Sequence, residues 1–258
     1  MGHNRLGRLP KTQSWPSVVA LIAVGGSTSD IAAAAAKAAE NSLAHAASDP
    51  VLHHAFWLLT QLPVAARAPD FAARLRELKI DAGETPSLLS LAAAFQESVE
   101  TGTRRSADKT DLGEMAHLAA TEALTTALVA DLPSLFSATS EDIRYSLGKC
   151  AAPDRFAKLA RSFFARLTTR NLEYFVSRVI PEHIGPGRGF RSVSDYAEFR
   201  QALAQHCYEA AFIVEMFSRD WYAKTNWQGG VTPANAAGFV HVALRKLRAE
   251  LRQRGAHA

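Results

Sequence analysis

Apolar residues recur at intervals of three and four along most of this chain, which is the spacing of one face of an α-helix. The clearest pattern runs from Pro153 to about Ile180. Its apolar stripe consists of Phe156, Ala160, Phe163, Leu167 and Tyr174. A neighbouring stripe on the same segment is cationic and consists of Arg155, Lys158, Arg166 and Arg170. The pattern therefore predicts a long helix with one buried face and one positively charged face.

Two further long helices are predicted near the C-terminus. The first begins at Asp195, where Glu198 completes the spacing of a capping box, and continues to about Ala223. The second begins at Thr232 and Pro233, because threonine is a good cap and proline suits the first helical position. One side of this last helix is apolar, with Val240, Leu244, Leu247 and Leu251. Its other side is cationic, with Arg245, Lys246, Arg248, Arg252 and Arg254.

Shorter helices are predicted in the first half of the chain. Alanine, which has the highest helix propensity, dominates residues 31–47, and we expect these to form one helix capped by Ser29 or Asp30. Asp49 followed by Pro50 marks another helix start. The remaining helices of this half are expected at residues 16–24, 70–78, 87–99 and 112–130.

No segment alternates apolar and polar residues over the length that a half-buried strand requires, except FRSVS at residues 190–194. The expected fold is therefore all-α, an irregular multi-helix bundle of about nine or ten helices. Composition divides the chain into a basic N-terminal arm at residues 1–13, an Ala-rich helical half at residues 14–135, and a basic helical half with long helices at residues 136–258.

The charge of the chain is uneven, although its formal net charge is only +4. Residues 1–140 carry 11 Lys and Arg against 14 Asp and Glu, whereas residues 141–258 carry 18 against 11. A basic half suits an anionic partner, such as an acidic protein face, a nucleic acid or a phosphate ligand. An ordinary solvated surface explains the same excess without any partner.

The segment IGPGRGF, residues 184–190, separates two of the long helices and has two interpretations. Its glycines let backbone N–H groups approach an anion, with which Arg188 and Arg191 would pair. However, the segment lacks the Lys-Ser or Lys-Thr of a phosphate-binding P-loop, and a helix rather than a strand precedes it. Glycine and proline also suffice to end one helix and turn the chain. An ordered connector is therefore favoured over a ligand-binding loop.

The residues that commonly carry catalysis or bind metal do not form a complete motif. Glu114 and His117 have the E-x-x-H spacing of di-iron bundles, but those bundles need two such pairs and two more glutamates. His206 and Cys207 are adjacent, and neighbouring helical side chains diverge by about 100°, so they do not form a nucleophile–base pair. Cys150 has no base near it in the sequence. No catalytic residue, metal or cofactor is therefore predicted.

The cysteines and the apolar runs bear on the location of the protein. Two cysteines without a C-x-x-C pair do not make a disulfide framework, so a reducing cytoplasm is the simplest location. The apolar run at residues 18–24 resembles the centre of a signal peptide, but GGSTSD follows it instead of a cleavage site. No apolar stretch approaches the ~20 residues of a membrane span. We therefore expect a cytoplasmic protein without a membrane segment.

Residues 167–251, which run from LTTRNLEYF to RKLRAEL, and the opening MGHNRLGRLP resemble a group of uncharacterised bacterial proteins. The resemblance covers roughly the last third of the chain and its first few residues, and it transfers no catalytic residue. It implies a bacterial cytoplasmic setting, a multi-gene cluster such as an anti-phage defence cluster, and a role that depends on a partner.

The leading hypothesis is a non-enzymatic helical accessory or adaptor subunit of a bacterial multi-protein system, which docks an acidic protein partner through its basic C-terminal half. A nucleic-acid-binding module that uses the same surface is the alternative, and an enzyme with a metal site at Glu114 and His117 is the third hypothesis. The residues expected to bind the partner or an anion are Arg188, Arg191, Trp227, Arg245, Lys246, Arg248 and Arg252.

Overall fold

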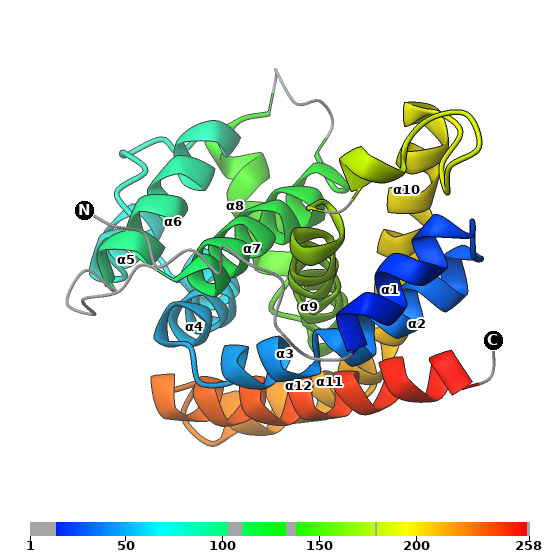
Figure 1. Cartoon of the computed structure of the whole chain (residues 1–258). Coiled ribbons are helices and arrows are strands. Elements are labelled where there is room, and N and C mark those ends of the chain that lie inside the picture. Colours follow the sequence, from blue (N-terminus) through cyan, green and yellow to red (C-terminus); the bar gives the residue numbers. More distant parts are fainter. Residues whose placement is uncertain (1–13, 103–109, 133–137, 179, 257–258) are drawn as a thin grey trace.

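The computed structural model describes residues 14–102, 110–132, 138–178 and 180–256, so the expected basic arm at residues 1–13 lies outside the described residues. Within these ranges the chain is all-helical, which confirms the predicted fold class. One isolated bridge joins Ile184 and Phe190. Figure 1 shows the other helices arranged around α9 (Pro153–Val176) near the centre of the molecule.

Twelve α-helices and one short 3₁₀-helix, η1 (Ile180–His183), occur in the described ranges, so the expected nine or ten helices were too few. None of these helices is both long enough and apolar enough to cross a membrane. The α-helices other than α9 are α1 (Ser14–Ala23), α2 (Thr28–Ala38), α3 (Glu40–Ala46), α4 (Pro50–Ala66), α5 (Phe71–Glu77), α6 (Leu88–Gly102), α7 (Asp111–Val129), α8 (Ser140–Lys149), α10 (Val193–Ala210), α11 (Phe212–Trp227) and α12 (Pro233–Ala256).

Two predicted helices are each broken in two, and both breaks fall at alanines. The helix predicted at residues 31–47 is divided at Ala39, and the helix predicted from Asp195 to Ala223 is divided at Ala211. Neither following helix has a side-chain cap at its start. Both α10 and α11 pack against α9 and α12, and α10 packs against α2 as well. The helix propensity of alanine does not predict either break.

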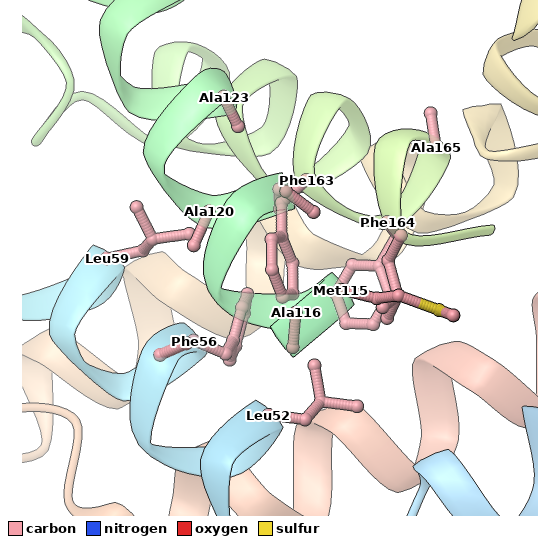
Figure 2. Packing of buried hydrophobic residues seen from close by; sticks show 14 of the residues in the cluster. Leu52, Phe56, Leu59, Met115, Ala116, Ala120, Ala123, Phe163, Phe164 and Ala165 are labelled. Atoms are coloured by element: carbon pink, nitrogen blue, oxygen red, sulfur yellow. The ribbon is translucent and has the colours of Figure 1, made fainter. Parts of the chain in front are cut away.

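The core lies against α9, and the predicted apolar stripe of this helix forms much of it. The stripe residues that are fully buried are Phe156, Ala160, Phe163 and Leu167. Tyr174 is partly buried, and its hydroxyl donates to Asp111 at the start of α7 (2.6 Å). Figure 2 shows Phe56 of α4 facing Phe163 and Phe164 of α9. This single cluster of buried residues includes members from Trp15 to Leu251, so it draws on both halves of the chain.

The starts of α4 and α7 are joined by two capping side chains. Asp49 accepts hydrogen bonds from two backbone N–H groups in the first turn of α4, as its position before Pro50 predicts. Thr110 caps α7 by accepting from the N–H of Gly113, and its hydroxyl donates to the Asp49 carboxylate (2.6 Å). Because these caps are linked, the N-terminal end of α7 is tied to that of α4 by a hydrogen bond as well as by packing.

The connection between α9 and α10 is an ordered, closed loop. The N–H of Gly185 donates to the carbonyl of Phe190 (2.8 Å), and the N–H of Phe190 donates to the carbonyl of His183 (3.0 Å). The loop also rests on α1, because a Cβ atom added to Gly189 would lie 1.7 Å from the backbone oxygen of Ile22. These contacts support the interpretation of IGPGRGF as an ordered connector that sets where α10 begins.

Candidate docking groove along α9

An open groove runs along α9, with α7 on one side and α10 on the other. Both flanking helices pack against α9, and Figure 1 shows them on either side of it. The groove has a volume of about 1250 Å³, and it adjoins a second hollow of about 490 Å³ that shares Arg170, Glu173 and Arg200 with it. Small-molecule pockets enclose ~300–1,000 Å³. An open groove of this size suits a segment of another chain better than a small ligand.

The cationic stripe predicted on α9 lies in this groove. Its members Arg155, Lys158, Arg166 and Arg170 all line it. Glu122 of α7 forms an ion pair with Arg166 (2.9 Å) and another with Arg170. Because one carboxylate serves two guanidinium groups, one unit of positive charge is left without a counter-charge at this point.

Toward the N-terminal end of α9, one carboxylate is again shared by two cations. Asp131 forms ion pairs with both Arg155 (3.2 Å) and Lys149 (3.6 Å). Lys158, one turn further along α9, is exposed and makes no ion pair with any described residue. The groove is therefore positively charged along the part of α9 between Arg155 and Arg170.

Toward the C-terminal end of α9, the groove carries negative as well as positive side chains. Glu173 holds Arg200 of α10 through both carboxylate oxygens (2.9 and 3.2 Å), and this hydrogen bonding raises the pKa of Arg200. Glu198 also lines the groove and makes no ion pair within the described ranges. Glutamates are thus mixed with the cations, and a uniformly anionic ligand such as a phosphate backbone would meet repulsion at this end.

Small or short side chains lie between the long charged and polar side chains that line the groove. On α7 these are Ala123, Thr126 and Ala127, followed by Ala130 just after the helix, and on α10 they are Ala202 and Ala204. Ser162, Ala165 and Thr169 of α9 lie between them. Small side chains let another backbone approach closely, because few atoms project into the space.

One end of the groove adjoins an exposed apolar stripe. Tyr208 of α10, Phe212 and Met216 follow at intervals of four, and they are 40%, 47% and 60% exposed. Arg161 lies over the rings of Tyr208 and Phe212, 3.9 and 5.1 Å from their centroids, and pairs with Glu215 (2.8 Å). Contiguous exposed apolar residues on a surface commonly mark a protein contact, and Tyr208 lines the groove itself.

The seven binding residues predicted from the sequence lie in three separate places, and none of them lines the groove. Arg188 and Arg191 are exposed in the connection between α9 and α10, and Trp227 is 87% exposed at the end of α11. The other four lie on α12. Figure 1 shows that the connection before α10 and the start of α12 lie at opposite ends of the molecule.

The four cations predicted on α12 have different environments. Arg248 (3.1 Å) and Arg252 (2.8 Å) both pair with Glu40, so they fasten α12 to α3. Arg245 is exposed and makes no ion pair with the described residues, while the Lys246 ammonium lies 5.7 Å from the ring centroid of Phe217. Arg245 and Lys246 are therefore the members of this set that remain available to a partner.

Many polar groups of the loop that carries Arg188 and Arg191 bond within the loop or to the start of α10. The backbone N–H groups of Gly185, Arg188 and Phe190 donate to carbonyls within the loop, and the N–H of Arg191 donates to Asp195. The guanidinium of Arg188 donates to the carbonyl of Glu182. Several of the donors that would surround an anion are thus engaged with the protein itself.

The candidate metal ligands do not assemble into a site within the described ranges, where no group of three or more His, Cys, Asp or Glu side chains is placed to hold a metal ion. His117 is buried on α7, whereas Glu114 of the same E-x-x-H pair is exposed. Burial lowers the pKa of His117, which favours the neutral ring. The pair gives no geometric support to the hypothesis of a metal enzyme.

Neither thiol is expected to react in the folded protein. Burial raises the pKa of Cys150 to about 11 and that of Cys207 to about 12, and the thiolate is the reactive form. At pH 8, a disulfide reagent such as DTNB should label no cysteine of the native protein within minutes, and both after denaturation in guanidinium. Rapid labelling of one thiol without denaturant would contradict this expectation.

Stability is expected to fall as the pH is lowered from 7.5 to 5.5. Burial lowers the pKa values of His54, His117 and His206 below that of an exposed histidine, so the unfolded chain binds protons more readily. The stabilising contribution is complete above the unfolded pKa of about 6.5 and is lost below it. Thermal melts over this range should show a falling Tm, and the fall should be smaller in His117→Gln. A Tm that rises on acidification would refute the assignment.

Searches of protein-family models, of curated proteins and of solved structures found no match to this chain.

Sequence reasoning identified the cations of α9 but not the groove in which they lie. The groove needs α7 and α10 to flank α9, and nothing in the local pattern specifies that arrangement. Two signals were present in the sequence: the four cations on one stripe of α9, and the spacing of four between Tyr208, Phe212 and Met216. Together they would have indicated a charged surface beside an apolar one.

Proposed function

We propose that this protein is a non-enzymatic helical adaptor of a bacterial multi-protein system, and that it docks an acidic protein partner through its basic C-terminal half. The observation that carries the proposal is the positively charged groove along α9, where Asp131 and Glu122 each serve two cations and Lys158 has no counter-charge among the described residues. The floor of the groove and one of its walls belong to the basic half.

The mixture of charges and apolar residues supports a protein partner over a nucleic acid. Nucleic-acid sites are usually dominated by cations, with aromatic rings placed to stack on bases. Here Glu122, Glu173 and Glu198 line the groove. Among the described residues that line it, Tyr208 is the one aromatic residue. The exposed stripe beside Tyr208 adds apolar area of the kind that protein interfaces bury.

Affinity capture from the native host with nuclease treatment tests this function. We expect a protein to be retained after nuclease treatment, to be lost with Lys158→Glu, and to persist with Arg245→Glu. Both substitutions reverse one exposed charge on a helix of the basic half, so they are matched in charge and in expected stability. Retention that is unaffected by either substitution, or no retained protein, would count against the proposal.

The residues predicted from the sequence define a second candidate surface for the same partner. Trp227, Arg245 and Lys246 are exposed on α11 and α12, outside the groove. If a partner is lost with Arg245→Glu and kept with Lys158→Glu, this surface rather than the groove is the docking site.

Nucleic-acid binding is the alternative function, and the excess of cations along α9 favours it. Neutralisation of phosphates by Lys and Arg makes affinity fall steeply with salt. A salt titration with a labelled single-stranded oligonucleotide therefore separates the two functions. Absence of binding at low salt eliminates the alternative, and a steep decline that Lys158→Glu reduces would establish it.

A role in anti-phage defence is the most specific form of the proposal, and it rests on the resemblance of residues 167–251 to bacterial proteins encoded in gene clusters. Deletion of the gene from such a cluster should abolish protection against phage, and Lys158→Glu should have the same effect at normal protein levels. Full protection after deletion would remove this setting.

A further inference from the structure

The groove along α9 has the shape of a vacant helix position. α7 and α10 both pack against α9, but they do not pack substantially against each other, so the surface of α9 between them is left open. We propose that the occupant is a single acidic amphipathic helix of a partner protein, which lies lengthwise on α9 between α7 and α10. This inference rests on the proposed function and specifies the partner segment.

The dimensions favour a helix. α9 has 24 residues, so it is about 36 Å long at ~1.5 Å per residue. A helix of about 20 residues is about 30 Å long and would cover most of it. The small side chains Ala127, Ala130, Ala202, Ala204 and Ser162 line the space, and they let the backbone of a fourth helix approach α9. The described residues also contain no strand, so the groove offers no sheet edge to an extended peptide.

The charges set where the partner's carboxylates must lie. Excess positive charge occurs around Arg155 and Lys158, where Asp131 also serves Lys149, and again around Arg166 and Arg170, where Glu122 serves both. These two regions are separated by about eleven or twelve residues of α9, or about 16–18 Å along its axis. A carboxylate placed at each region would complete the pairing.

A helix meets this requirement with acidic residues about eleven positions apart. Eleven residues make just over three whole turns of ~3.6 residues, so both carboxylates project from the same face. The face that contacts the alanines must be apolar and formed by small or medium side chains. Toward Glu198, which makes no ion pair with the described residues, the helix should carry no acidic residue, because this glutamate would repel it. The predicted partner segment is therefore acidic at two places and not along its whole length.

Binding of synthetic peptides tests the inference with a defined probe. The probe is a fluorescein-labelled 20-residue helical peptide with Glu at positions 5 and 16, Ala and Leu along the same face, and Gln elsewhere. One comparison peptide has Lys at positions 5 and 16, and another has the same composition with Glu at positions 5 and 10. A fourth carries two prolines in the middle, which break the helix.

Fluorescence anisotropy at low ionic strength should show that the first peptide binds the full-length protein. Lys158→Glu should weaken this binding by about tenfold, because it replaces an attraction with a repulsion, while Arg245→Glu should leave it within about twofold. The Lys peptide and the proline peptide should not bind, and the respaced peptide should bind several-fold more weakly. Circular dichroism of both variants should show wild-type helix content.

Several results would overturn the inference. These are absence of binding by the first peptide, equal binding by the respaced or proline peptide, and equal weakening by Lys158→Glu and Arg245→Glu. Tighter binding of a single-stranded oligonucleotide, with the same sensitivity to Lys158→Glu, would assign the groove to nucleic acid. If capture from the host still yields a protein that depends on Lys158 while the peptides fail, the adaptor function stands and only the helical acidic segment is wrong.

Discussion

Phe56→Ala is expected to lower the free energy of unfolding by about 3–5 kcal/mol. Phe56 is fully buried on α4 and lies at the centre of a group of aromatic rings. Its ring centroid is 4.9 Å from that of Phe239, 5.5 Å from that of Phe164 and 5.8 Å from that of Phe163. Truncation would leave a cavity between α4, α9 and α12, because these helices are held apart by their own packing.

Val64→Ala is the matched control for this substitution. Val64 lies on the same helix and is 40% exposed, so its truncation should change stability by no more than about 0.5 kcal/mol. Urea denaturation followed by circular dichroism gives both values. A loss below about 1 kcal/mol for Phe56→Ala, or equal losses in the two variants, would mean that the aromatic cluster does not hold these helices together.

Gly189→Ala is expected to be the next most damaging single substitution, with a loss of at least about 2 kcal/mol. The added Cβ would lie 1.7 Å from the backbone oxygen of Ile22 and 2.8 Å from its carbonyl carbon. Backbone atoms cannot rotate away as a side chain can, so either the loop or α1 must move. The connection between α9 and α10 would then separate from α1, and amides near Ile22 should exchange faster with solvent.

Gly187→Ala separates this clash from general strain in the same loop. Gly187 has a φ of +73°, and a Cβ there would meet no atom within 4 Å. Its substitution should therefore cost only the roughly 1–2 kcal/mol of a left-handed non-glycine residue, without faster exchange in α1. Hydrogen exchange measured by mass spectrometry compares the two variants. Wild-type exchange near Ile22 in Gly189→Ala would show that the loop does not rest on α1.

The helices that are predictable from sequence are those with local signals. Asp49 before Pro50 marks the start of α4, and Thr232 before Pro233 marks that of α12, because caps and first-turn prolines act within a few residues. The breaks at Ala39 and Ala211 have no such signal. Alanine favours the helix at both places, so the local sequence does not predict that the chain turns there.

The candidate site was predictable in part. The cations of α9 form a stripe that can be read from the sequence, but their partners cannot, since Arg166 pairs with Glu122 over 44 positions. The same limit applies to α12. Arg248 and Arg252 read as a free cationic face, yet both pair with Glu40, more than 200 positions away in the chain. Charge patterns show where cations lie on a helix, and the fold decides which of them are neutralised.

Site-specific photo-cross-linking in the native host tests most directly whether the groove along α9 docks a protein. Benzoylphenylalanine would replace Gln201, which is exposed in the groove, and in separate variants the exposed Trp227 and the 81% exposed Leu89 of α6. We predict a nuclease-resistant cross-linked protein from position 201, which disappears when Lys158→Glu is added and is not formed from position 89. Cross-linking from position 227 alone, or equally from positions 201 and 89, would contradict a docking groove between α7 and α10.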